Sequence, residues 1–247
     1  MPTTLCAVAL AASMFAPQAP PPAAPVPPPV KAWNGSLSAG LSITSGNRNT
    51  SNFNVAFDVV RDRKGANVFK ADGLYLRGKS EKNVTGDQLR VSARDEVTFK
   101  GRGFLFGQAR YLRDRFKGID FMLAPSTGIG YDLFDTNGSS LGVMGGIGGV
   151  WEEDRERGLR SSGSITFDQK LVYKVSTSAR ITESISGLWK TDDITDALYT
   201  LNAGLAAGIS ARAQLKMELL LTYKNRPSGA TVNKNDTALI MGVVYKI

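Results

Sequence analysis

The sequence predicts an all-β protein, a closed antiparallel up-and-down transmembrane β-barrel of about 12 strands. Apolar and polar residues alternate along nearly the whole chain from residue 33 onward, and this is the period of a strand. Most alternating segments have ten or more residues, roughly the nine to eleven that a tilted strand needs to cross hydrocarbon. No apolar run reaches the roughly 18 residues of a transmembrane helix.

The alternation defines the strands and keeps one phase throughout. We expect strands near residues 33–44, 50–60, 66–77, 86–99, 103–114, 118–133, 138–152, 161–174, 178–190, 196–210, 212–224 and 236–247. In all of them the apolar face carries odd residue numbers, as with Phe53, Val55 and Phe57. Consecutive hairpins that keep one face outward would produce this constant parity.

The even face carries the charges, and we expect it to line the lumen. The lumen-facing candidates are Asp58, Lys70, Asp72, Arg90, Arg94, Glu96, Arg110, Asp132, Asp168, Lys170, Arg180, Lys216 and Glu218. A soluble barrel would instead turn the apolar face inward, and this inverse orientation is the competing interpretation.

Aromatic residues favour the apolar-outward orientation, because they fall at both ends of the odd face. Rings in these positions are expected as two girdles where the wall meets lipid head groups. One set is Trp33, Phe69, Phe99, Tyr131, Tyr173 and Tyr245, and the other is Tyr75, Tyr111, Phe121, Trp151, Trp189, Tyr199 and Tyr223.

The connections favour the same orientation. Short turns are expected at 62–65, 100–102, 135–138, 175–177 and 211, and mostly longer loops at 78–85, 153–160, 191–195 and 225–235. Short turns on one side and longer loops on the other are the outer-membrane layout, with both termini on the periplasmic side. The final Tyr245-Lys246-Ile247 is similar to the signal by which barrel-assembly machinery recognises its substrates.

Four charged residues break the parity. Asp95 and Glu183 lie in mid-strand on the odd face, where a β-bulge would explain them. Asp87 and Arg113 are also odd but lie near the predicted loops.

The N-terminal part predicts export. Residues 1–19 are expected to be a signal peptide, because residues 5–16 form a short apolar run. Residues 20–32 are a proline-rich periplasmic linker, since eight prolines between residues 17 and 29 favour an extended chain. The barrel then comprises residues 33–247.

The composition argues against an enzyme and against nucleic-acid binding. The chain has no histidine, and its one cysteine, Cys6, lies in the predicted signal peptide. We therefore predict no catalytic, cofactor-binding or metal-binding residues. The net charge of +8 is spread along the chain rather than clustered, which argues against a nucleic-acid patch.

Several groups of residues occur in a characteristic order: 33–35 and 44–47 near the start, 111–120 and 128–131 in the centre, 223–227 and 234–237 near the end. In this order they resemble the YdiY-like salt-induced outer membrane protein family. The resemblance implies an outer-membrane barrel of unassigned biochemical role, and it implies no catalytic residues.

Three functions stay open. The first is a narrow channel or binding barrel for small polar or anionic solutes in salt or envelope stress. The second is a non-conducting structural or stress-response surface barrel, and the third is an outer-membrane hydrolase around Ser126 or Asp114. We expect the cell outer membrane of a Gram-negative bacterium, with outer-membrane lipid and lipopolysaccharide as partners of the charged loops at 113–119, 152–160 and 225–236. The sequence does not indicate an oligomeric state.

Overall fold

The computed structural model describes residues 33–45, 50–62, 67–80, 83–115, 117–227 and 232–247. The predicted signal peptide and linker lie outside these described residues. No helix among the described residues is long and apolar enough to cross a membrane.

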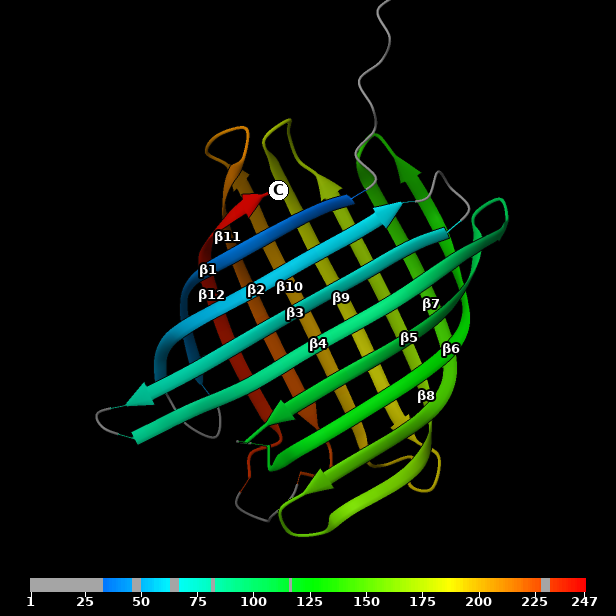
Figure 1. Ribbon diagram of the computed structural model, residues 1–247, viewed down its shortest axis with the longest axis vertical. Helices are drawn as coiled ribbons and strands as arrows, with labels where there is room; N and C mark the ends of the chain where they lie inside the picture. The colour runs from blue at the N-terminus through cyan, green and yellow to red at the C-terminus, as the bar shows by residue number, and fades with distance from the viewer. Residues whose placement is uncertain (1–32, 46–49, 63–66, 81–82, 116, 228–231) are drawn as a thin grey trace, which may run out of the picture. The chain divides into compact units, whose positions relative to one another are not determined.

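The described chain forms a closed antiparallel barrel of twelve strands, as the alternation predicts (Figure 1). Each strand pairs with its neighbours in sequence, and β1 closes the barrel against β12. The strands are β1 (Trp33–Ser45), β2 (Thr50–Asp62), β3 (Asn67–Ser80), β4 (Asn83–Lys100), β5 (Gly103–Asp114), β6 (Ile119–Thr136), β7 (Ser139–Asp154), β8 (Gly158–Lys174), β9 (Ala179–Lys190), β10 (Ala197–Gly208), β11 (Ala213–Lys224) and β12 (Asn235–Lys246).

The register explains the constant parity of the sequence. Across every seam, odd residues pair with odd residues and even with even, as in Leu37↔Tyr245 on the closing seam. The exceptions follow bulges near strand ends. Because successive side chains alternate between the two faces of a sheet, all odd side chains of the wall share one face.

The odd face is the outer face. Among the described residues, every exposed large hydrophobic except Ile194 has an odd number, whereas most buried hydrophobics, such as Phe106 and Leu220, have even numbers. The inverse orientation, with an apolar interior and a wet exterior, is therefore wrong. The wall has an apolar exterior and an interior in which polar and charged residues predominate.

The two ends of the barrel differ. We call the end with Trp33 and Ile247 the turn end, and the opposite end the loop end. At the turn end, Asn137 and Gly138 have φ of 50° and 84°, which is the two-residue turn that joins β6 and β7 directly. At the loop end, residues 225–234 form the longest connection.

Two predicted details are wrong. No register shift occurs at Asp95 or Glu183, so neither residue sits on a bulge and both side chains face outward. The longer loops predicted at 78–85 and 153–160 are shorter, because β3 and β4 extend to Ser80 and from Asn83, and β7 and β8 to Asp154 and from Gly158. Backbone pairing continues beyond the part of the wall that faces lipid, and there the residues no longer alternate between apolar and polar, so the sequence does not reveal the strand.

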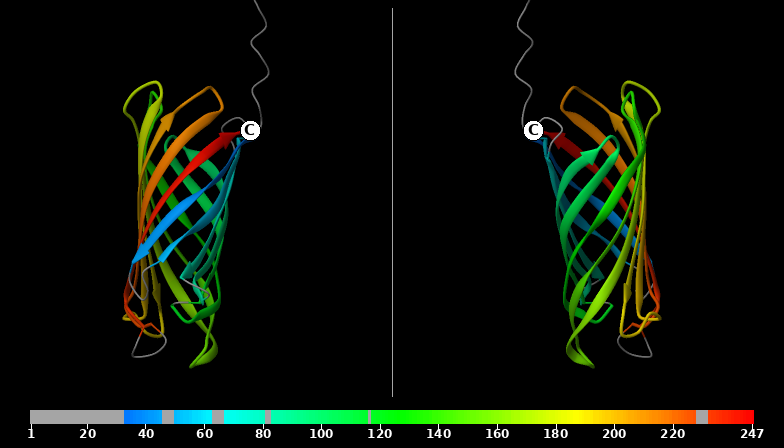
Figure 2. Two further views of the ribbon diagram at one scale, coloured as in Figure 1. Left: turned by 90° about the vertical axis from the view of Figure 1, so that its left-hand side faces the viewer. Right: turned by 90° about the vertical axis from the view of Figure 1, so that its right-hand side faces the viewer.

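The barrel is oval in cross-section. Figure 1 shows its broad side and Figure 2 its narrow side, so that strands on opposite walls lie close together. Side chains that meet across the interior confirm this, since Leu76 of β3 packs in one cluster with Leu220 of β11. This flattening determines how the lumen is filled.

Candidate functional site: the lumen

The predicted lumen residues all lie on the inner, even face. Most lie toward the turn end of their strands, and only Arg90 and Arg110 lie in the middle or toward the loop end. The turn-end group consists of Asp58, Lys70, Asp72, Arg94, Glu96, Asp132, Asp168, Lys170, Arg180, Lys216 and Glu218.

Several of these charges form ion pairs along or across the wall. Glu96 lies 2.7 Å from Lys70 and 2.8 Å from Arg94. Arg110 of β5 pairs with Asp168 of β8, and Lys216 pairs with Glu218 on the same strand. Such pairs hold side chains in place but contribute little net stability where water reaches them.

Four of the predicted lumen charges in this half are exposed although they point into a closed barrel. These are Asp58, Asp72, Lys170 and Arg180. Asp58 and Lys170 influence each other electrostatically but form no ion pair, and Arg180 has no ion-pair partner among the described residues. Exposure on an inward face means that solvent enters the turn-end half of the lumen.

A buried ionic network fills the loop end. We call Glu152, Lys190, Asp196 and Lys224 the loop-end network. Glu152 of β7 pairs with Lys190 of β9 at 2.8 Å and with Lys224 of β11, while Lys190 also contacts Asp196 at 2.7 Å. The side chains are only 1% exposed for Glu152, 6% for Lys190, 3% for Asp196 and 2% for Lys224. Charges this deeply buried persist only when they are paired and hydrogen-bonded.

Lys117 adds a second closure beside this network. It leaves the connection between β5 and β6, and its ammonium lies 3.0 Å from Asp236 of β12. It also donates to the backbone oxygens of Asn233 and Lys234, at 3.1 Å and 2.6 Å. The side chain is 1% exposed, so one loop is fastened onto another across the mouth.

Apolar and polar contacts across the lumen lie beneath these ions. One cluster joins β5, β6, β7 and β9 through Leu112, Ile119, Met122, Ala124, Val150 and Leu188. Arg90 of β4 donates to the hydroxyl of Thr222 on β11 at 2.7 Å. The loop-end half is therefore packed from wall to wall, whereas solvent enters the turn-end half.

The sequence prediction missed the loop-end network. Glu152, Lys190 and Lys224 stand at the ends of predicted strands, where the loop at 152–160 and the neighbouring connections were expected. One signal could have found them: all three have even numbers, the parity of the inner face. Their meeting point could not be read from the sequence, because it depends on the oval cross-section.

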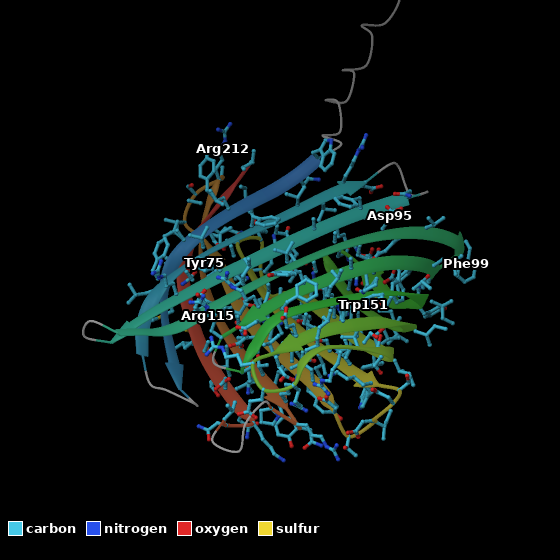
Figure 3. The ribbon with its side chains drawn as sticks, turned by 60° about the horizontal axis from the view of Figure 1, so that its bottom comes forward. Tyr75, Asp95, Phe99, Arg115, Trp151 and Arg212 are labelled. Carbon is cyan, nitrogen blue, oxygen red and sulfur yellow. The ribbon has the colours of Figure 1, made fainter. Side chains whose placement is uncertain are left out.

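The predicted aromatic residues lie on the outer face toward both ends. Trp33, Tyr131, Tyr173 and Tyr245 are about half exposed near the turn end. The loop-end residues Tyr75, Tyr111, Trp151, Trp189, Tyr199 and Tyr223 lie on the same face, and Trp189 donates to the hydroxyl of Tyr199 at 2.9 Å. Figure 3 marks Phe99 of the turn-end set and Tyr75 and Trp151 of the loop-end set.

The comparisons with known proteins agree with this architecture. The family model described as "Protein of unknown function, DUF481" matches residues 37–247. The NanC porin has a similar structure, with a TM-score of 0.58 and 10% sequence identity over 85% of this chain and 100% of that chain.

Two further solved structures share the fold. The translocator domain of autotransporter NalP from Neisseria meningitidis gives a TM-score of 0.51 and 11% identity over 87% of this chain and 88% of that chain. The COG4313 outer membrane channel from Pseudomonas putida F1 gives a TM-score of 0.51 and 12% identity over 89% of this chain and 96% of that chain. No curated protein sequence matches the chain. At such identities the likeness concerns the fold, which is that of outer-membrane porins and channels.

Proposed function

We propose that this chain, which belongs to the DUF481 family of unknown function, is an outer-membrane barrel that admits small polar solutes and is gated at its loop end. The observation that carries the proposal is the contrast between the two halves of the lumen. Charged side chains are exposed to solvent on the turn side, while the loop side is closed by buried ion pairs. A wall of fixed charges facing water is the physical basis of selective passage in barrels.

The gate in this proposal is the loop-end network together with Lys117. Both are polar, so they can exchange their ion pairs for water when the mouth opens, unlike a purely apolar plug. The thirteen predicted lumen residues include seven basic and six acidic side chains, so any preference for anions should be slight. Weak preference and low conductance are the expected signature.

Single-channel recording in planar bilayers tests the proposal. We expect small and intermittent currents from the wild-type barrel, and a larger open fraction from Glu152→Gln, because Lys224 then loses its carboxylate partner. Glu183→Gln is the matched control, since Glu183 faces outward between Leu171 and Ala203 and should leave the current unchanged. Folded wild-type and Glu152→Gln barrels that both stay silent at all voltages would refute conduction.

A non-conducting structural or stress-response barrel is the second candidate. The contacts of Leu76 with the Leu220 cluster and of Arg90 with Thr222 favour it, because they tie opposite walls together. A hydrolase is the least supported, since the chain lacks histidine. Lipid and peptide hydrolysis assays on the folded barrel would reveal it.

The surroundings of the barrel are part of the same proposal. Asp87 on the outer face near the loop end lies 2.9 Å from Arg113 and 3.6 Å from Arg115. Two arginines on one carboxylate leave a net positive patch that suits the phosphates of lipopolysaccharide. Delivery by the barrel-assembly machinery, a Gram-negative outer membrane and induction by salt complete the proposal. Cell fractionation after salt exposure tests the location and the induction together.

A further inference from the structure

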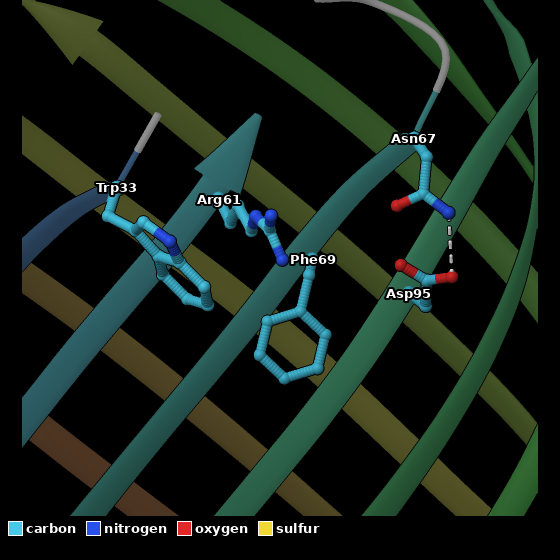
Figure 4. A pocket seen from close by; sticks show the side chains of 5 residues that line it. All are labelled: Trp33, Arg61, Asn67, Phe69 and Asp95. Atoms are coloured by element: carbon cyan, nitrogen blue, oxygen red, sulfur yellow. Dashed lines mark hydrogen bonds between the residues drawn. The ribbon is translucent and has the colours of Figure 1, made fainter. Parts of the chain in front are cut away.

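An unassigned pocket lies on the outer face near the turn end. It is lined by Trp33, Arg61, Asn67, Phe69 and Asp95, and its volume is about 340 Å³ (Figure 4). All five residues have odd numbers, so the pocket lies outside the lumen and belongs to a different surface from the gate. The volume is at the lower end of the range for small-molecule sites.

The pocket arises from the register of four neighbouring strands. Trp33 of β1 pairs with Arg61 of β2, Arg61 with Phe69 of β3, and Phe69 with Asp95 of β4. The row continues to Gly107 of β5, where an added Cβ would meet no atom within 4 Å. Open space therefore adjoins the carboxylate of Asp95.

The cationic side of the pocket is Arg61. Its guanidinium carbon lies 4.8 Å from the centroid of the Trp33 ring, in cation–π geometry. Its Nε is buried without a hydrogen-bond partner, and no carboxylate among the described residues forms an ion pair with Arg61. The arginine is held by an aromatic ring, and no carboxylate among the described residues neutralises its charge.

The anionic side is Asp95. Its carboxylate accepts a hydrogen bond of 2.9 Å from the side-chain amide of Asn67, and the side chain is exposed (Figure 4). It lies on the same face as Phe99, four positions further from the turn end of β4 (Figure 3). An acid on the lipid face of a barrel costs free energy unless a partner neutralises it.

We propose that this pocket binds the phosphoethanolamine headgroup of a phospholipid in the inner leaflet of the outer membrane. The phosphate pairs with Arg61 and the ammonium with Asp95 beside the open space at Gly107, so the ethanolamine carbons cross Phe69, and the glycerol and acyl chains continue from the phosphate along the apolar wall. Opposite charges two strands apart, on β2 and β4, match a zwitterion, and the turn end is the side where both barrel termini lie. The inference rests on the membrane placement under Proposed function but is independent of conduction.

The chemistry separates this headgroup from the other phospholipids. A primary ammonium donates three hydrogen bonds and can approach Asp95 closely, whereas the quaternary ammonium of phosphatidylcholine donates none. Phosphatidylglycerol carries no cation, so its headgroup leaves the charge of Asp95 without a counterion. The pocket should therefore prefer phosphatidylethanolamine to both.

The test is native mass spectrometry of the detergent-purified barrel exchanged with equimolar phosphatidylethanolamine, phosphatidylglycerol and phosphatidylcholine. We expect wild-type protein to retain phosphatidylethanolamine about tenfold over phosphatidylglycerol, the scale of one charge-assisted hydrogen bond. Asp95→Asn should remove that preference, and Arg61→Gln should weaken retention of all three lipids.

Glu183→Gln is the matched control, because it removes an outward carboxylate that has Leu171 and Ala203 as its cross-strand partners. It should leave the preference intact. If Asp95→Asn does not fold, Gly107→Leu tests the same site by filling the space beside Asp95. Equal retention of all lipids by folded wild-type protein, or equal losses in Asp95→Asn and Glu183→Gln, overturns the proposal. Conductance measured on the same samples reports separately on the gate.

Discussion

Replacing Glu152 by glutamine should destabilise the barrel more than any single change on its outer face. The loop-end network contains two cations, Lys190 and Lys224, and two anions, Glu152 and Asp196. Glu152→Gln leaves two lysines with one carboxylate. Lys190 keeps Asp196 at 2.7 Å, but the ion-pair partner of Lys224 is Glu152, so a charge that is 2% exposed loses its counterion.

The expected cost follows from that burial. Breaking a buried ion pair by removing one partner costs about 3–5 kcal/mol, because the remaining charge stays desolvated. Glutamine retains one acceptor oxygen, which places the estimate near the lower end, at about 3 kcal/mol. Lys224→Met in the same chain removes the orphaned charge, so the double variant should return to within about 1 kcal/mol of wild type.

Equilibrium urea unfolding of the barrel folded into lipid vesicles measures both quantities. Tryptophan fluorescence is a suitable readout, because Trp151 directly precedes Glu152 in β7. A double-mutant cycle over wild type, the two single variants and the double variant isolates the coupling. Additive effects of the two substitutions, or a loss below about 1 kcal/mol for Glu152→Gln, would show that the network is solvated and would refute the reasoning.

Three further changes test other parts of the barrel. Gly40→Ala should impair closure of the barrel, because a Cβ there would lie 1.9 Å from the backbone oxygen of Met241 across the β1–β12 seam. Heat-modifiable migration on gels measures this closure. Gly35→Ala, where the nearest atom to the added Cβ is 3.4 Å away, should migrate as wild type. The Thr195 hydroxyl, together with Arg226, lowers the pKa of the exposed Asp193 carboxyl. The ionised carboxylate therefore contributes to the order of the loop above its ordinary pKa of about 3.9. This contribution is lost as the pH falls through the lower pKa of the folded state. Thr195→Val should raise that pKa in a carbon-13 titration, and an unchanged midpoint would contradict the assignment. Lys117→Ala should speed trypsin cleavage after Lys234, since the Lys117 ammonium binds the backbone oxygens of Asn233 and Lys234, whereas Lys246→Ala at the turn end should not.

The sequence predicts the wall of this barrel well because the wall obeys a local rule. Each side chain faces either the lipid or the interior, and the alternation of apolar and polar residues shows which of the two it faces. Parity therefore predicted the outward face of Phe57 and Ile129 without knowledge of any contact. Strand ends were less predictable, as at Asp154, because backbone pairing extends beyond the lipid zone where that choice applies.

The gate and the outer pocket could not be predicted in the same way, because both depend on which strands meet. Glu152 and Lys224 are 72 positions apart, and only the oval closure brings them together. Asp95 was recognisable in the sequence as an exception to the parity rule, yet the bulge that would have explained it does not exist. The register of β2, β3 and β4 places Arg61 and Phe69 in the same row as Asp95. The acid that the sequence left unexplained is therefore the anionic side of the proposed zwitterion site. Asp95 thus marks a position where the outer wall departs from simple alternation, and its partner could be named only once the register was known.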